Sequence, residues 1–129
     1  MDNLVLILAA AIAAGTPLVF AALGELVTEK SGVLNLGVEG MMLVGAIAGF
    51  ATASVSGSLM IGIFAGMLAG ALMSFVFAVL TLNLMANQVA SGLALTLFGV
   101  GLSAFVGKPF ESVSLPHYGP LEIPYLSQI

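Results

Sequence analysis

The fold is decided by an uncharged stretch, residues 40–107, which reads GMMLVGAIAGFATASVSGSLMIGIFAGMLAGALMSFVFAVLTLNLMANQVASGLALTLFGVGLSAFVG. Because roughly 20 apolar residues in a helix cross the hydrocarbon core of a bilayer, this stretch is long enough for three crossings. Small polar residues cluster at 54–58 and at 83–88, where they favour turns. The stretch therefore predicts three transmembrane helices, near residues 39–56, 59–82 and 88–107.

The residues before this stretch predict a fourth crossing, near residues 3–24. No charge lies between Asp2 and Glu25. A cleavable signal peptide is the alternative, but the first residues lack the positive charge typical of one. Pro17 removes a backbone donor inside this span and predicts a kink. With 60% hydrophobic residues, 6% charged residues and a mean hydropathy of +1.23, the chain is expected to be an all-α, polytopic transmembrane helix bundle of about four spans in the lipid bilayer.

The composition also excludes several classes of function. There is no cysteine, so disulfides and thiolate metal sites are excluded. His117 is the single histidine, which argues against a metal site and fits a solvated loop residue. No basic patch indicates nucleic acid as a partner, and the spans hold no paired carboxylates or nucleophile with a base, so we expect no catalytic residues. Lys30 and Lys108 are separated by an odd number of spans and give opposite indications of orientation.

Two segments outside the predicted spans have a distinct character. Residues 25–38 are too polar to span a membrane, yet residues 33–38 are too apolar for a simple solvated loop, so we expect a re-entrant or interfacial segment. Within it, Glu25, Glu29 and Lys30 are expected to be solvated surface. Residues 108–129 contain four prolines and predict an extramembrane tail, and the chain ends within it, which suggests the N-terminal part of a longer membrane-embedded domain.

Small residues recur at four-residue spacing along the predicted third span, at Ser58, Gly62, Gly66, Gly70 and Ser74. Since four residues is just over one helical turn, they share one face and allow a close helix approach. Similar series occur on the second span, at Gly45, Gly49, Ala53 and Gly57, and on the fourth, at Gly99, Ser103 and Gly107. We expect Gly62, Gly66 and Gly70 to pack helices; a sliding interface used in gating is the alternative.

Polar side chains near the spans are the candidates for a substrate path. If residues 35–39 are helical, Asn35 and Glu39 lie one turn apart, although Glu39 could simply favour the positive end of the following helix. Asn83, Asn87 and Ser91 share a four-residue spacing, with Gln88 adjacent. They could line a hydrated path for a polyhydroxylated solute or form an ordinary turn between helices.

Two sequence blocks carry a resemblance to a known family. The first runs from Thr16 to Met42 and includes Ser-Gly-Val-Leu-Asn-Leu-Gly-Val-Glu-Gly at 31–40; the second is residues 87–96, NQVASGLALT. Both resemble permease subunits of ABC importers in the branched-chain amino acid, ribose and nucleoside family, and most of all the nucleoside type. The resemblance covers essentially the whole chain, although members of that family are considerably longer.

The resemblance implies a transport subunit and not an enzyme. We expect a nucleoside translocation path in the bacterial plasma (inner) membrane, completed by a second homologous permease and supplied by a substrate-binding lipoprotein or periplasmic protein. ATP would be used by a separate ABC ATPase subunit, since this chain has no phosphate-binding Gly-Lys-Ser or Gly-Lys-Thr loop and is expected to bind no cofactor. Simple sugars or branched-chain amino acids as the solute, or a self-assembling small channel, are the alternatives.

Overall fold

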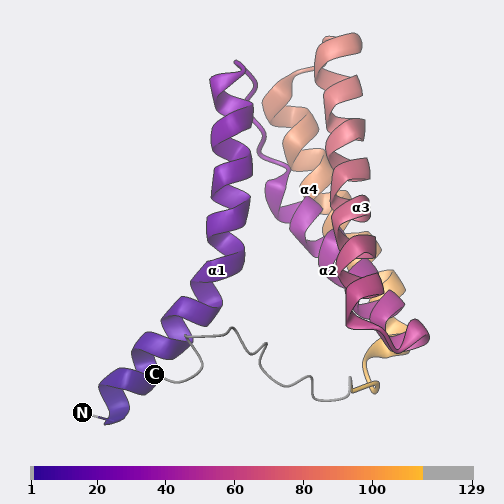
Figure 1. Cartoon of the computed structure of the whole chain (residues 1–129). Helices are drawn as coiled ribbons and strands as arrows, with labels where there is room; N and C mark the ends of the chain where they lie inside the picture. The colour runs from indigo at the N-terminus through magenta and orange to yellow at the C-terminus, as the bar shows by residue number, and fades with distance from the viewer. Residues whose placement is uncertain (1, 115–129) are drawn as a thin grey trace.

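The computed structural model of the protein describes residues 2–114, and these form four long helices without any strand (Figure 1). The helices are α1 (Asp2–Lys30), α2 (Val38–Ser56), α3 (Leu59–Ala78) and α4 (Gln88–Gly107). A π-helical turn, Val79–Asn83, extends α3, and a 3-10 turn, Lys108–Phe110, follows α4. All four helical stretches are long and apolar enough to cross a membrane, so the chain is a multi-pass membrane protein.

Helices α2, α3 and α4 pack together, whereas α1 leans away from them (Figure 1). The core between the three packed helices is small and consists of Met41, Val44, Met73, Phe77 and Leu95. No residue of α1 is buried, and large apolar side chains such as Phe75 and Phe105 are exposed on the outside. Such a surface suits a lipid environment, where apolar side chains need no protein cover.

Close contact between α2 and α3 depends on two pairs of glycines. A methyl group on Gly62 would lie 2.8 Å from the carbonyl oxygen of Gly49, and one on Gly66 would lie 3.0 Å from that of Gly45. Gly62 and Gly66 thus lie at the close contact with α2, whereas a methyl group on Gly70 would meet nothing within 4 Å. The packing role of the three glycines stays a prediction.

The contact between α2 and α4 is closer still. A methyl group on Gly99 would lie 2.5 Å from the carbonyl oxygen of Gly40, and one on Gly40 would lie 2.6 Å from that of Leu95. Only glycine allows backbones to approach in this way. The series predicted on the fourth span included Gly99, but its partner Gly40 was not singled out, since it lies outside the four-residue series on α2.

The helix boundaries differ from the predicted ones in two places. Residues 25–30 continue α1 for more than a turn beyond the predicted end at residue 24, so the non-helical connection begins only after Lys30. Charged residues are compatible with a helix end that projects beyond the apolar core, which is why the charge pattern placed the boundary too early. Of the predicted tail 108–129, residues 115–129, which include His117, lie outside the described residues.

Candidate functional site

The connection between α1 and α2 descends between helices in an extended conformation. Figure 1 shows the start of α2 lying well below the neighbouring ends of α1 and α3. The backbone N–H of Leu34 donates to Gln88 Oε1 at 2.9 Å, and Thr96 Oγ1 donates to the carbonyl oxygen of Leu36 at 3.0 Å. Two side chains of α4 thus satisfy backbone groups that have no helical partner, which non-helical backbone requires away from water.

A glycine on α4 permits this approach. A methyl group on Gly92 would lie 2.9 Å from the backbone nitrogen of Leu36 and 3.0 Å from that of Gly37. Any larger side chain there would push the connection away from α4 and stretch the bonds to Gln88 and Thr96. Residues 34–37 are therefore held against α4 by their close approach to Gly92 and by hydrogen bonds with Gln88 and Thr96.

Asn35 is the most buried polar side chain of this connection, with 7% of its surface exposed. Its Oδ1 accepts a hydrogen bond from the backbone N–H of Gly37 at 2.9 Å. Because that N–H can only donate, the orientation of the amide is fixed, and Nδ2 is the atom left to face Met41. Nδ2 lies 3.5 Å from the Met41 sulfur, which is a weak acceptor. The amide donor of Asn35 is thus poorly satisfied.

Glu25 occupies a position that the sequence did not reveal. Its Oε1 accepts a hydrogen bond from the backbone N–H of Asn35 at 3.1 Å, whereas its Oε2 is buried and has no hydrogen-bond partner. The expectation of a solvated surface residue is therefore wrong. Because α1 extends to Lys30, the residues Ala21, Glu25 and Thr28 lie on one face of the helix. That spacing is the one sequence feature that could have indicated that Glu25 faces the groove.

The expected pairing of Asn35 with Glu39 is not found. Residues 35–37 are not helical, so the one-turn spacing does not apply, and Asn35 is tied to Glu25 instead. Glu39 lies in the first turn of α2 with its side chain exposed. In that position its charge interacts favourably with the positive end of the helix.

The four polar residues near the turn between α3 and α4 do not form one helical stripe. Asn83 ends the π-helical turn and is exposed, and residues 84–87 are not helical, with Met85 in a left-handed conformation at φ 53°. Asn87 caps α4 by accepting from the backbone N–H of Ala90 at 3.0 Å. Gln88 faces the connection, as described, and Ser91 lies half-buried one turn further along α4. The structure brings Gln88 and Asn35 to the same connection, and leaves Asn83 and Glu39 on the surface.

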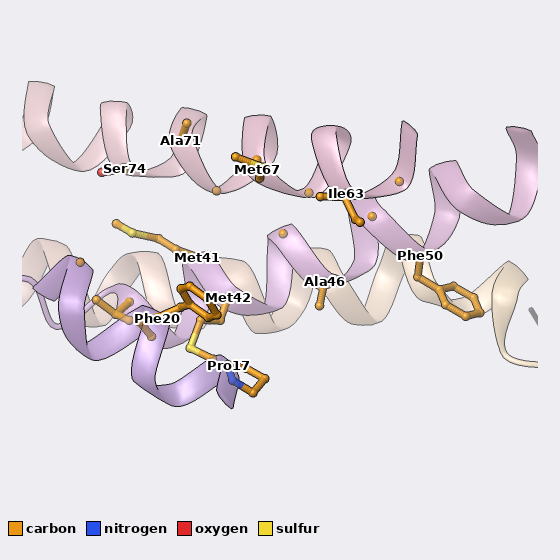
Figure 2. A pocket seen from close by; sticks show the side chains of 18 of the residues that line it. Pro17, Phe20, Met41, Met42, Ala46, Phe50, Ile63, Met67, Ala71 and Ser74 are labelled. Atoms are coloured by element: carbon orange, nitrogen blue, oxygen red, sulfur yellow. The ribbon is translucent and has the colours of Figure 1, made fainter. Parts of the chain in front are cut away.

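A groove of about 1100 Å³ runs between α1, α2 and α3. Figure 2 shows Pro17 and Phe20 of α1, Met41 and Met42 of α2, and Met67 of α3 around this space. The glycine faces of α2 and α3 form its floor, and most of the remaining lining is apolar. Glu25, Thr28 and Asn35 bring polar atoms to one end of the groove, and Ser74 adds a hydroxyl from α3. We call the first three residues the polar end of the groove.

No metal site accompanies these residues, since the described part of the chain contains no group of three His, Cys, Asp or Glu side chains able to hold an ion. The comparison with known families gives the assignment. Residues 7–118 match the model of the branched-chain amino acid transport system / permease component family. The chain belongs to this permease family. That membership agrees with the expectation of a transport component rather than an enzyme.

Two curated permeases are similar to this family member. One is the putative glucose ABC transporter permease protein TsgC13 of Haloferax volcanii, 43% identical over 122 residues, which cover 95% of this chain and 37% of the relative. The other is the guanosine ABC transporter permease protein NupQ of Bacillus subtilis, 44% identical over 41 residues, or 32% of this chain and 13% of the relative. The chain thus spans little more than a third of the length of the first relative. No solved structure matches it.

Proposed function

We propose that this chain forms part of the translocation path of an ABC importer for a nucleoside. The observation that carries the proposal is the non-helical connection at 33–37, which is held by side chains of α1 and α4 and lines a groove between helices, in a chain of the permease family. Broken backbone inside a helix bundle is typical of transporter substrate sites, because it offers polar groups where helices offer none.

The relatives support two candidate solutes. Similarity to the guanosine permease supports a nucleoside, although it covers only a third of the chain. Similarity to the glucose permease over 95% of the chain supports a simple sugar as the second candidate. Both solutes carry ring hydroxyls that can replace hydration with hydrogen bonds to carboxylate and amide groups.

The proposal includes the partners that such an importer needs. An ABC ATPase subunit would hydrolyse ATP, a second homologous permease would complete the path, and a substrate-binding lipoprotein or periplasmic protein would deliver the solute. The chain itself would bind no cofactor and would reside in the plasma membrane, in bacteria the inner membrane. Of the residues predicted for the path, Asn35 and Gln88 have the strongest support, since both take part in holding the connection.

The test is solute uptake by intact cells. Cells with and without the gene that encodes this chain would be given radiolabelled guanosine or radiolabelled glucose at micromolar concentration. We expect loss of guanosine uptake in the deletion strain, restored by the gene on a plasmid. Loss of glucose uptake alone would select the second candidate, and unchanged uptake of both would contradict the proposal.

A further inference from the structure

The groove between α1, α2 and α3 is lined in a strongly uneven way. Polar atoms are concentrated at the end formed by Glu25, Thr28 and Asn35, and apolar side chains line most of the rest. On α1 the lining residues are spaced as one helical face, from Pro17 and Phe20 to Thr28. The groove therefore offers an apolar wall that continues into a small polar end.

The polar end contains hydrogen-bonding capacity that the described residues leave unused. Glu25 Oε2 has no partner, and the amide donor of Asn35 has only the Met41 sulfur at 3.5 Å. Thr28 Oγ1 donates to the carbonyl oxygen of Gly24 at 3.0 Å, which leaves its lone pairs free to accept. Buried polar groups are nearly always satisfied in native proteins, so the unpartnered Oε2 of Glu25 and the weakly bonded Nδ2 of Asn35 each indicate a missing partner.

The chemistry of that partner follows from these atoms. Glu25 Oε2 needs a donor and Asn35 Nδ2 needs an acceptor, and two neighbouring hydroxyl groups supply both. Oε2 is closed off in this structure, but the terminal torsion of a glutamate is soft, and a turn of the carboxylate would bring Oε2 to the groove while it moves Oε1 away from the N–H of Asn35. A lipid chain or an apolar helix seated in the groove would leave both atoms unpaired.

The apolar wall of the groove favours a nucleoside over a sugar. Phe20 of α1 is 73% exposed, and Figure 2 shows Phe20 and Met42 pointing into the space between α1 and α2. A flat ring can lie against an aromatic side chain and a thioether. A nucleoside carries its hydroxyls on the ribose and a flat base at the other end, whereas a hexose carries hydroxyls around its ring and would leave several unpaired against the apolar wall.

We propose that this groove is the nucleoside site, with the ribose hydroxyls bound by Glu25 and Asn35 at the polar end and the base resting on Phe20 and Met42. The inference rests on the proposed import of nucleosides and adds to it the residues that select the ribose. Glu25 thereby becomes a specificity-determining residue, with Thr28 as a further acceptor.

The test compares two solutes in strains that differ only in this chain. Uptake of radiolabelled guanosine and of 2′,3′-dideoxyguanosine would be measured with the wild-type chain, Glu25→Gln and the control Glu29→Gln, each in the complete importer and normalised to permease in the membrane. Glu29 is exposed one turn further along α1, so its exchange removes a charge without touching the groove. The amide oxygen of Glu25→Gln can still accept from Asn35, which keeps the contact between α1 and the connection.

We expect the wild-type chain and Glu29→Gln to prefer guanosine over the dideoxynucleoside about tenfold or more, the effect of one hydrogen bond to a charged group. Glu25→Gln should reduce guanosine uptake and bring the two rates close together. Because every other component of the importer is unchanged, a loss of preference must arise in this chain. Phe20→Ala should lower both rates and leave their ratio unchanged.

The outcomes distinguish a failure of the proposed site from a failure of the proposed function. Absence of guanosine uptake with the wild-type chain would contradict nucleoside import itself. Normal wild-type uptake, combined with a Glu25→Gln variant that slows both solutes equally or neither, would overturn the site. If Glu25→Gln fails to accumulate in the membrane, Thr28→Val takes its place, since it is nearly isosteric and lies at the same polar end. The ratio of guanosine uptake to 2′,3′-dideoxyguanosine uptake is then compared with that of the wild-type chain.

Discussion

Exchange of Gly99 for alanine should separate α2 from α4. The added methyl group would lie 2.5 Å from the carbonyl oxygen and 2.6 Å from the Cα atom of Gly40. Both are backbone atoms, so no side chain can rotate away. Since ordinary contact begins at 3.4 Å, the two helices must move apart by about 0.9 Å (3.4 minus 2.5) at this point.

The cost can be worked out from the contacts that this movement strains. Overpacking of a close interface costs roughly 1–3 kcal/mol. The bond from Thr96 Oγ1 to the carbonyl oxygen of Leu36 lies within one turn of Gly99, and its weakening adds about 1 kcal/mol. We therefore expect the clash in Gly99→Ala to lower the free energy of unfolding by roughly 2–4 kcal/mol relative to a Gly→Ala exchange of the same helix without a clash.

Gly101→Ala is the matched control, because a methyl group on Gly101 of the same helix would meet nothing within 4 Å. Both variants gain the same helix propensity from alanine, about 1 kcal/mol, so their difference isolates the clash. The assay is the thermal unfolding midpoint of the purified permease in detergent. We expect Gly99→Ala to unfold at least about 5 °C below Gly101→Ala. Midpoints within about 1 °C of each other would refute the close approach of α2 and α4.

Three further predictions concern packing, topology and the connection. Gly66→Leu should lower the yield of folded permease, whereas Gly70→Leu, on the same helix face but in open space, should be tolerated; equal yields would contradict the packing of α2 on α3. Single cysteines at Ser56 and Asn87, at opposite ends of α3, should react with a membrane-impermeant maleimide from opposite sides, and same-side labelling would exclude α3 as a complete span. Gln88→Leu should reduce solute uptake and cost about 1 kcal/mol or more of stability, because the N–H of Leu34 loses its acceptor, while Gln88→Glu, which keeps an acceptor oxygen, should do neither.

The number and type of helices could be predicted because they depend on local composition. An uncharged run from Gly40 to Gly107 has few alternatives to three membrane helices, and the small polar residues at 54–58 mark a real break, with Gly57 in a left-handed conformation at φ 71°. Backbone groups must be satisfied within each segment in lipid, so the helix is nearly obligatory there. This is why the sequence predicts the fold more securely than it predicts the site.

The glycine contacts could be predicted only in part. A four-residue spacing places Gly62, Gly66 and Gly70 on one face of α3, but the distance to the neighbouring helix changes along that face because the two helices cross. An added methyl group would meet the backbone of α2 at Gly62 and Gly66 and would meet nothing within 4 Å at Gly70. The periodicity of small residues predicts which face of a helix they share. The length of that face in contact with the neighbouring helix depends on how the two helices cross.

The candidate site was the least predictable part, because its contacts join residues far apart in the chain. The bond between Leu34 and Gln88 spans 54 residues, and that between Thr96 and Leu36 spans 60. Asn35 and Gln88 were singled out as polar residues near the spans, but their actual neighbours could not be derived from spacing.

Glu25 shows the physical reason for the largest error. Its sequence neighbourhood holds Glu29 and Lys30, which indicates a solvated stretch, and both of those side chains are indeed exposed. Glu25 lies one turn earlier, on the face of α1 that turns toward α2, where the buried connection needs an acceptor for the N–H of Asn35. That need arises from the non-helical backbone at 33–35 and not from anything local to Glu25. A buried carboxylate is costly unless its oxygens accept hydrogen bonds, and only Oε1 of Glu25 accepts one within the described residues. Oε2 is the atom to which the proposed ribose hydroxyl would donate.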